Sequence, residues 1–117
     1  WNERRRGAAD AYAASDLGQE LRLPVPGAGV DHVYHLYVAT ADDADELAAR
    51  LGDAGVQARG YYRVPLHRQP PLAPYATGEL PVTDELARTN IALPMGPELT
   101  QEQVAAVADA CARTVTG

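Results

Sequence analysis

The 117-residue sequence contains no lysine and no phenylalanine, and it has one cysteine, one methionine and one tryptophan. All ten basic residues are therefore arginines, and no side-chain amine is available to form a Schiff base or to act as an amine nucleophile. A single cysteine excludes a disulfide within the chain and a zinc site built from several cysteines. Nothing in the sequence indicates an oxidising compartment, and we expect a cytoplasmic protein.

The chain is also poor in positive charge and in long apolar runs. Its formal net charge of -6 argues against a nucleic acid or an anionic membrane surface as a partner. The only basic run, Arg4 to Arg6, is typical of the solvated face of a helix. No apolar run approaches the roughly 20 residues that span a bilayer. Because the chain starts at Trp1, already inside a predicted helix, we expect a fragment of a longer polypeptide.

The residue pattern predicts a single α+β domain with a small, mainly antiparallel sheet of about three strands, packed with helices. Strands are expected over residues 32–39, 56–62 and 91–93, where aromatic and β-branched residues are common. Helices are expected over residues 3–15, after Thr40, over 83–89 and after Thr100. Residues 63–81 contain five prolines and predict an irregular surface loop.

Two of the predicted helices carry a clear apolar stripe and recognisable end signals. Thr40 is the expected N-cap of the first, Gly55 its left-handed C-terminal residue, and Thr100 and Gln103 form a capping box for the second. The first stripe consists of Ala44, Leu47, Ala48 and Leu51. The second consists of Val104, Val107, Ala108, Cys111 and Val115.

The candidate site is the segment that contains Tyr61, Tyr62, Arg63 and His67. Two adjacent tyrosines end a predicted strand, and Pro65 imposes extended backbone before a histidine that the apolar pattern does not require. Neighbouring strand residues point to opposite faces, so only one tyrosine should reach a ligand unless the strand is broken there. Tyr62 is the stronger candidate. The alternative is a strand end with one ring in the core, followed by a surface histidine.

Two other groups of polar residues have simpler structural explanations. His35 should lie half-buried in a strand beside Tyr37, and it is the weakest site candidate. A zinc site made from the three histidines is excluded because His32 and His35 would point to opposite sides of that strand. The acidic residues 42–46 lack the glycine and the spacing of a calcium loop, and they fit a solvated helix start.

The order of these segments resembles the C-terminal part of the DegT/DnrJ/StrS-type sugar aminotransferases over nearly the whole chain. The resemblance is carried by the segments Tyr34 to Tyr37, Gly55 to Val56, Tyr61 to Gln69, Glu79 to Asp84, Ile91 to Met95, and Leu99 to Val104. It departs from the family pattern at two positions. Many relatives have histidine at the position of Tyr61, and proline or a small residue at that of Arg63. Arg63 could therefore bind a diphosphate in a bidentate manner or face water.

The resemblance implies an enzyme of fold type I that depends on pyridoxal phosphate (PLP), is usually a homodimer, and transfers an amino group to a keto sugar carried on a nucleotide. Residues 1–117 would be its small C-terminal domain, with 1–17 the end of the interdomain helix and 63–81 a site loop. The absent N-terminal domain would supply the lysine and bind PLP, so this chain alone should be inactive. Tyr61, Tyr62, His67 and Arg63 would contact the nucleotide sugar.

The alternative is a free-standing small α+β module that binds a metabolite or pairs with itself as a regulatory domain, without chemistry of its own. Exposure of Trp1 and Tyr12 should separate the two interpretations. A fragment should leave both partly exposed for the missing domain, whereas a self-sufficient module should bury both.

Overall fold

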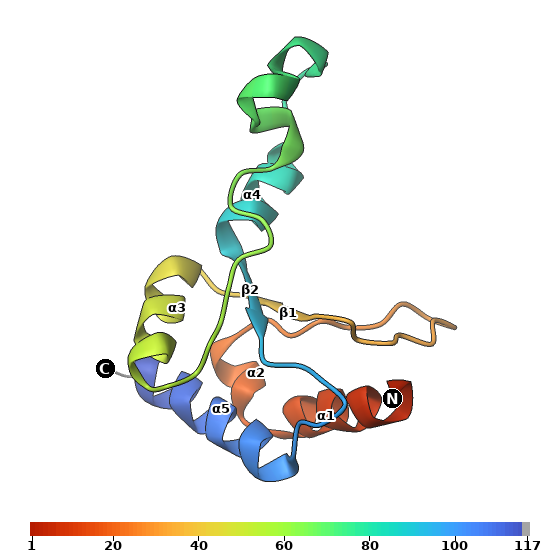
Figure 1. The fold of residues 1–117 in the computed structure, drawn as a ribbon, viewed down its shortest axis with the longest axis vertical. Helices are drawn as coiled ribbons and strands as arrows, with labels where there is room; N and C mark the ends of the chain where they lie inside the picture. The colour runs from red at the N-terminus through yellow and green to blue at the C-terminus, as the bar shows by residue number, and fades with distance from the viewer. Residues whose placement is uncertain (116–117) are drawn as a thin grey trace.

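The computed structural model describes residues 1–115 as a helical body with two projecting segments (Figure 1). The radius of gyration is 15.4 Å, compared with about 13 Å for a compact domain of this length. The elements follow the order α1 (Asn2–Ala14), α2 (Leu17–Glu20), β1 (Tyr37–Thr40), α3 (Ala44–Asp53), η1 (Leu66–Arg68), η2 (Pro70–Tyr75), α4 (Pro81–Thr89), β2 (Asn90–Leu93) and α5 (Gln101–Val115). Among these residues, no helix has both the length and the hydropathy to cross a bilayer.

The sheet consists of the antiparallel strands β1 and β2, with Tyr37 opposite Leu93 and Thr40 opposite Asn90. Each strand gains a single further bridge on its outer edge, from Arg22 to Thr40 and from Arg59 to Ala92. The α+β class is therefore confirmed, but the described chain has two strands and not three. Residues 56–62 do not form the predicted strand, because their backbone pairing with β2 is limited to the single bridge at Arg59.

The other predicted strand is shorter than expected and starts at Tyr37. Tyr34 has φ of 47°, in the left-handed region, which a strand residue cannot adopt. Its N–H donates to Nδ1 of His32 at 2.9 Å, and the two rings stack with centroids 4.2 Å apart. This local turn replaces the predicted strand over residues 32–36.

The helix predictions are correct except at one cap. Gln103 N donates to Thr100 Oγ1 at 3.2 Å and Thr100 N to Gln103 Oε1 at 2.9 Å, as the capping box requires. Gly55 has φ of 81°, as predicted. Thr40 is not the N-cap of α3 because it still belongs to β1; the cap is Asp43, whose carboxylate accepts from Glu46 N.

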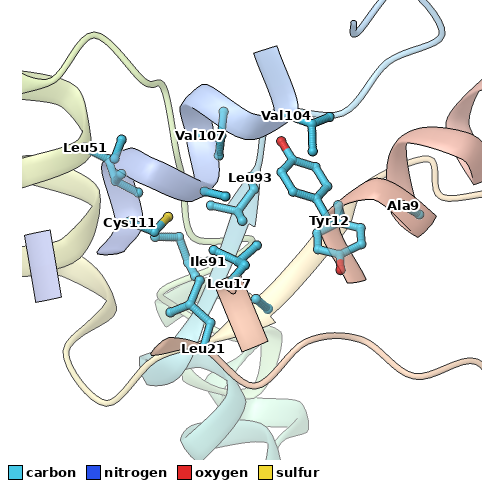
Figure 2. Packing of buried hydrophobic residues seen from close by; sticks show 14 of the residues in the cluster. Ala9, Tyr12, Leu17, Leu21, Leu51, Ile91, Leu93, Val104, Val107 and Cys111 are labelled. Carbon is cyan, nitrogen blue, oxygen red and sulfur yellow. The ribbon is translucent and has the colours of Figure 1, made fainter. Parts of the chain in front are cut away.

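The core lies between the inner face of the sheet and helices α1, α2, α3 and α5 (Figure 2). Both predicted stripes face it, with Leu47, Leu51, Val107 and Cys111 buried. The side chain of Val115 lies outside the described residues. On the opposite face of the sheet, Val38 and Thr40 of β1 are partly exposed, whereas all four residues of β2 are buried.

The exposure expected of Trp1 and Tyr12 in a fragment is found for one of these residues and not for the other. Trp1 is 81% exposed, as expected for a fragment, but Tyr12 is fully buried. The Tyr12 hydroxyl donates to Pro94 O at 2.8 Å, and its ring lies 4.8 Å from that of Tyr37. Tyr12 is thus part of this domain's own core, so the expectation of exposure was wrong for this residue.

Candidate functional site

The candidate site is formed by a projecting arm, residues 61–80, together with α4, which runs back from the tip of the arm to the sheet (Figure 1). The arm contains η1 and η2 and ends where Pro81 starts α4. Pro81 suits this position because the first turn of a helix needs no N–H donor there. All ten residues from 71 to 80 are exposed. The arm therefore has little core of its own and depends on anchoring contacts at its base.

Asn90 anchors the base of the arm. This residue is only 5% exposed, and its Oδ1 accepts from Tyr61 N at 2.6 Å. Its Nδ2 donates to Leu86 O at 2.7 Å and to Ala87 O at 3.3 Å, two carbonyls in the last turn of α4. A third strand would need the backbone N–H of Tyr61 to pair with β2, but this N–H donates to the Asn90 side chain instead.

Arg63 is the second anchor. Its Nη1 donates to Asn90 O at 2.6 Å and Ala87 O at 3.1 Å, and its Nε donates to a carboxylate oxygen of Asp45 on α3. A guanidinium at the carbonyl end of a helix also meets the negative end of the helix dipole. Arg63 therefore neither faces water freely nor presents an open fork to a diphosphate, the two alternatives left by the sequence.

Tyr61 and Tyr62 line an open groove of about 590 Å³ between the arm, α4 and the accessible face of the sheet. Because the strand is broken before them, both rings reach the same groove, and they pack edge to face with centroids 5.3 Å apart. Tyr62 is 73% exposed and Tyr61 40%. The other walls are mainly apolar, with Val38 from β1 and Leu86 from α4. Such a surface can hold a ring by stacking and position it with two phenol hydroxyls.

His67 lies on η1 and does not line this groove. Its side chain is 12% exposed, and Nε2 lies 3.1 Å from Asp84 Oδ1 as a close contact without the alignment of a hydrogen bond. Arg68 holds the same carboxylate with two bonds of 3.1 and 2.6 Å, and these hydrogen bonds lower the pKa of Asp84. His67 instead borders a second cavity of about 280 Å³, beside Tyr75.

His35 lies apart from the other predicted residues. It is exposed in a bend before β1 and lines neither cavity. The expectation of a half-buried strand histidine was wrong, because the turn at Tyr34 precedes the strand. Within the described part of the chain, histidine, cysteine and acidic side chains form no group of three that could hold a metal ion.

Two residues that organise the site were not singled out from the sequence. Asn90 follows a predicted helix and precedes a predicted strand, and a polar residue at such a junction can act as a cap. Asp84 was noted only as a residue of a helix start. For both, the partners lie on the arm, 16 or more residues away along the chain. Local sequence carries no signal for such contacts.

The chain is similar to known proteins over its whole length. The profile of the DegT/DnrJ/EryC1/StrS aminotransferase family matches residues 1–112. The UDP-N-acetyl-3-dehydro-alpha-D-glucosamine 3-aminotransferase of Acidithiobacillus ferrooxidans is 37% identical over 117 residues, which are 100% of this chain and 32% of that protein. The chain thus spans about a third of the length of this curated relative.

Solved structures agree with this relationship. A DegT DnrJ EryC1 StrS aminotransferase from Brucella abortus matches with a TM-score of 0.90 and 27% identity, over 99% of this chain and 31% of that one. NtdA from Bacillus subtilis, whose crystal structure holds the bound cofactor PMP, matches with a TM-score of 0.86 and 28% identity, over 99% and 28%. With the family profile covering most of its residues, the chain belongs to the DegT/DnrJ/EryC1/StrS aminotransferase family.

Proposed function

We propose that this chain is the C-terminal domain of a PLP-dependent aminotransferase that transfers an amino group to a keto sugar linked to a nucleotide. Its part in the reaction is to shape the substrate side of the active site. Family membership supports the reaction class, and the substrate named for the Acidithiobacillus enzyme supports the substrate class. The observation that carries the assignment to this domain is the pair of exposed tyrosines on one open groove.

The absence of lysine from this domain supports a division of tasks between it and the remainder of the protein. The described residues do not suit PLP as a covalently held group, because the chain has no lysine to bind its aldehyde. Its arginines near the groove are already engaged by carboxylates, Arg63 by Asp45 and Arg68 by Asp84. The lysine and the phosphate cradle belong to the N-terminal domain in this proposal. The chain is inactive alone, and the full-length protein is expected to be a homodimer.

In this proposal the predicted residues have different tasks. Tyr62 and Tyr61 contact the nucleotide sugar through ring faces and hydroxyls. Arg63 holds the base of the arm through its bonds to Asp45, Ala87 O and Asn90 O. His67 reaches a substrate only if the nucleotide extends into the second cavity, and His35, the weakest candidate from the sequence, stays a prediction. Binding by stacking and phenol hydrogen bonds suits a ligand with a flat base and many hydroxyls.

Substitutions in the full-length protein test this proposal. Tyr62→Phe removes one hydroxyl and should lower kcat/KM for the nucleotide sugar about threefold to tenfold, the effect of one hydrogen bond. His67→Ala should weaken turnover of the same substrate. Both variants should keep the cofactor absorbance and the rate with the amino donor. Tyr75→Phe is the control for the Tyr62 hydroxyl, because Tyr75 is 78% exposed on the same arm and lines the second cavity beside His67, not the groove. A loss of turnover in both Tyr75→Phe and His67→Ala would place the nucleotide in the second cavity. Loss of cofactor from Tyr62→Phe or His67→Ala would contradict the assignment.

A further inference from the structure

We propose that Asn90 is a positioning residue that sets the width of the groove by holding the arm to the end of α4. The inference rests on the proposed function, because it gives Asn90 its effect on substrate through Tyr61 and Tyr62. Asn90 itself touches no reacting atom in this account.

The bonding of Asn90 supports this role. Its carboxamide oxygen holds the arm through Tyr61 N, and its carboxamide nitrogen holds the last carbonyls of α4. Its own main-chain oxygen accepts from Arg63 Nη1. One buried residue thus bonds to the arm at two positions, Tyr61 and Arg63, and to α4 at two more. A buried amide with both ends satisfied fixes a unique geometry, because leaving either end unpaired is costly.

Asn90 also lies where the walls of the groove meet. The arm contributes Tyr61 and Tyr62 to one wall, α4 contributes Leu86 to another, and Asn90 lines the groove between them. A bond at this junction helps to fix the separation of the arm and α4, which are also joined by Arg63 to Ala87 O and by Arg68 to Asp84. Losing the bond from Tyr61 N should let the paired rings move away from α4 and widen the groove.

Three variants of the full-length protein separate positioning from general stability. Asn90→Ala removes both ends of the amide. Asn90→Asp keeps the oxygen that accepts from Tyr61 N and loses the donor to α4. Thr89→Val is the matched control, because Thr89 is also buried and its hydroxyl also donates to a carbonyl of α4, that of Glu85, without touching the arm.

Two readouts are needed, hydrogen exchange of the Tyr61 amide and the kinetics of the separate half-reactions. In Asn90→Ala the Tyr61 amide should exchange about tenfold faster, and KM for the nucleotide sugar should rise by a similar factor, while the amino-donor half-reaction is unchanged. Asn90→Asp keeps the acceptor for Tyr61 N but sets a carboxylate oxygen against Leu86 O and Ala87 O, so it should protect the Tyr61 amide only in part. Thr89→Val should alter neither readout. Unchanged exchange in Asn90→Ala would overturn the inference. If that variant does not fold, loss of all protection of the Tyr61 amide in Asn90→Asp would overturn it.

The outcomes also distinguish this inference from the proposed function. Faster exchange with an unchanged sugar KM in Asn90→Ala, but an altered kcat/KM in Tyr62→Phe, would overturn the positioning role and leave the proposed function standing. Unchanged sugar kinetics in both variants would show that the arm does not serve the substrate at all.

Discussion

The guanidinium of Arg63 occupies the space that a side chain at residue 60 would need. A Cβ atom at Gly60 would overlap Nη1 and Cζ of Arg63, well inside van der Waals contact. With Arg63 held in place by its hydrogen bonds, residue 60 has room for glycine but not for a larger side chain. Gly60 and Arg63 form one structural unit at the base of the groove.

Gly60→Ala should destabilise the chain. The new methyl group must displace a guanidinium that is held by Ala87 O, Asn90 O and Asp45. Loss of these charge-assisted bonds should cost about 2–4 kcal/mol of unfolding free energy, measured by urea denaturation. Gly7→Ala is the control, because Gly7 lies within α1 with open space around its Cα, and it should gain about 0.5–1 kcal/mol. Equal effects of the two substitutions would contradict the account.

Asp84→Asn should loosen the tip of the arm without unfolding the body. Asp84 is the only described residue that accepts hydrogen bonds from the Arg68 side chain, and it also contacts His67. Limited proteolysis with trypsin should cleave after Arg68 several times faster in the variant, while the urea midpoint changes little. Glu85→Gln breaks a comparable surface ion pair with Arg88 on the same helix and should leave cleavage unchanged. Equal cleavage rates in wild type and Asp84→Asn would contradict the role of Asp84.

Stability should fall as the pH rises from about 9 to 11. Because the chain has no lysine, cysteine and tyrosine are the side chains that titrate in this range. Burial raises the pKa of Cys111 to about 11 and that of Tyr37 to about 12, and it also raises that of Tyr12. The unfolded chain then releases these protons first, so the stabilisation is complete below about pH 9 and is lost as pH approaches the folded pKa values.

The pH effect can be measured as the urea midpoint between pH 7 and 11. Cys111 alone should account for about 2 kcal/mol by pH 11, from its shift of pKa. Cys111→Ala will be less stable at neutral pH, because it leaves a small cavity. Its midpoint should nevertheless stay flatter between pH 9 and 10 than that of wild type. A midpoint that rises with pH in wild type would contradict the sign of these shifts.

The lysine-free chain should not capture PLP. When the chain with an acetylated amino terminus is mixed with PLP, the absorbance spectrum should remain that of the free cofactor, and borohydride should fix no stoichiometric adduct. The full-length protein is the positive control. A stoichiometric adduct on the isolated chain would contradict the proposed division between the two domains.

Helices and caps could be predicted from the sequence because their signals are local. The stripe from Ala44 to Leu51 and the exchange of hydrogen bonds between Thr100 and Gln103 both depend on residues within a few turns of one another. The strand β2 was likewise marked by Ile91 to Leu93 and bounded by Pro94. Periodicity and capping sufficed for these elements.

One strand error and the site depend on distant contacts, whereas the other strand error has a local cause. The third strand ends because Asn90, far along the chain, takes the Tyr61 N–H, and the predicted strand over 32–36 is replaced by a left-handed turn at Tyr34. The groove likewise joins Val38 to the arm and to α4. Sequence patterns singled out the two tyrosines that line this groove, and their contact with a substrate stays a prediction; the contacts of Arg63 and Asn90 at the base of the arm became visible only in the fold.

The most direct measurement is a crystal structure of the full-length protein with its nucleotide sugar bound. We predict that the Tyr62 ring lies within about 4 Å of the ligand, in the groove between the arm and α4. The cofactor should lie on a lysine outside these 117 residues. A ligand that makes no contact with Tyr61 or Tyr62, or a groove filled by another part of the polypeptide, would contradict the central claim.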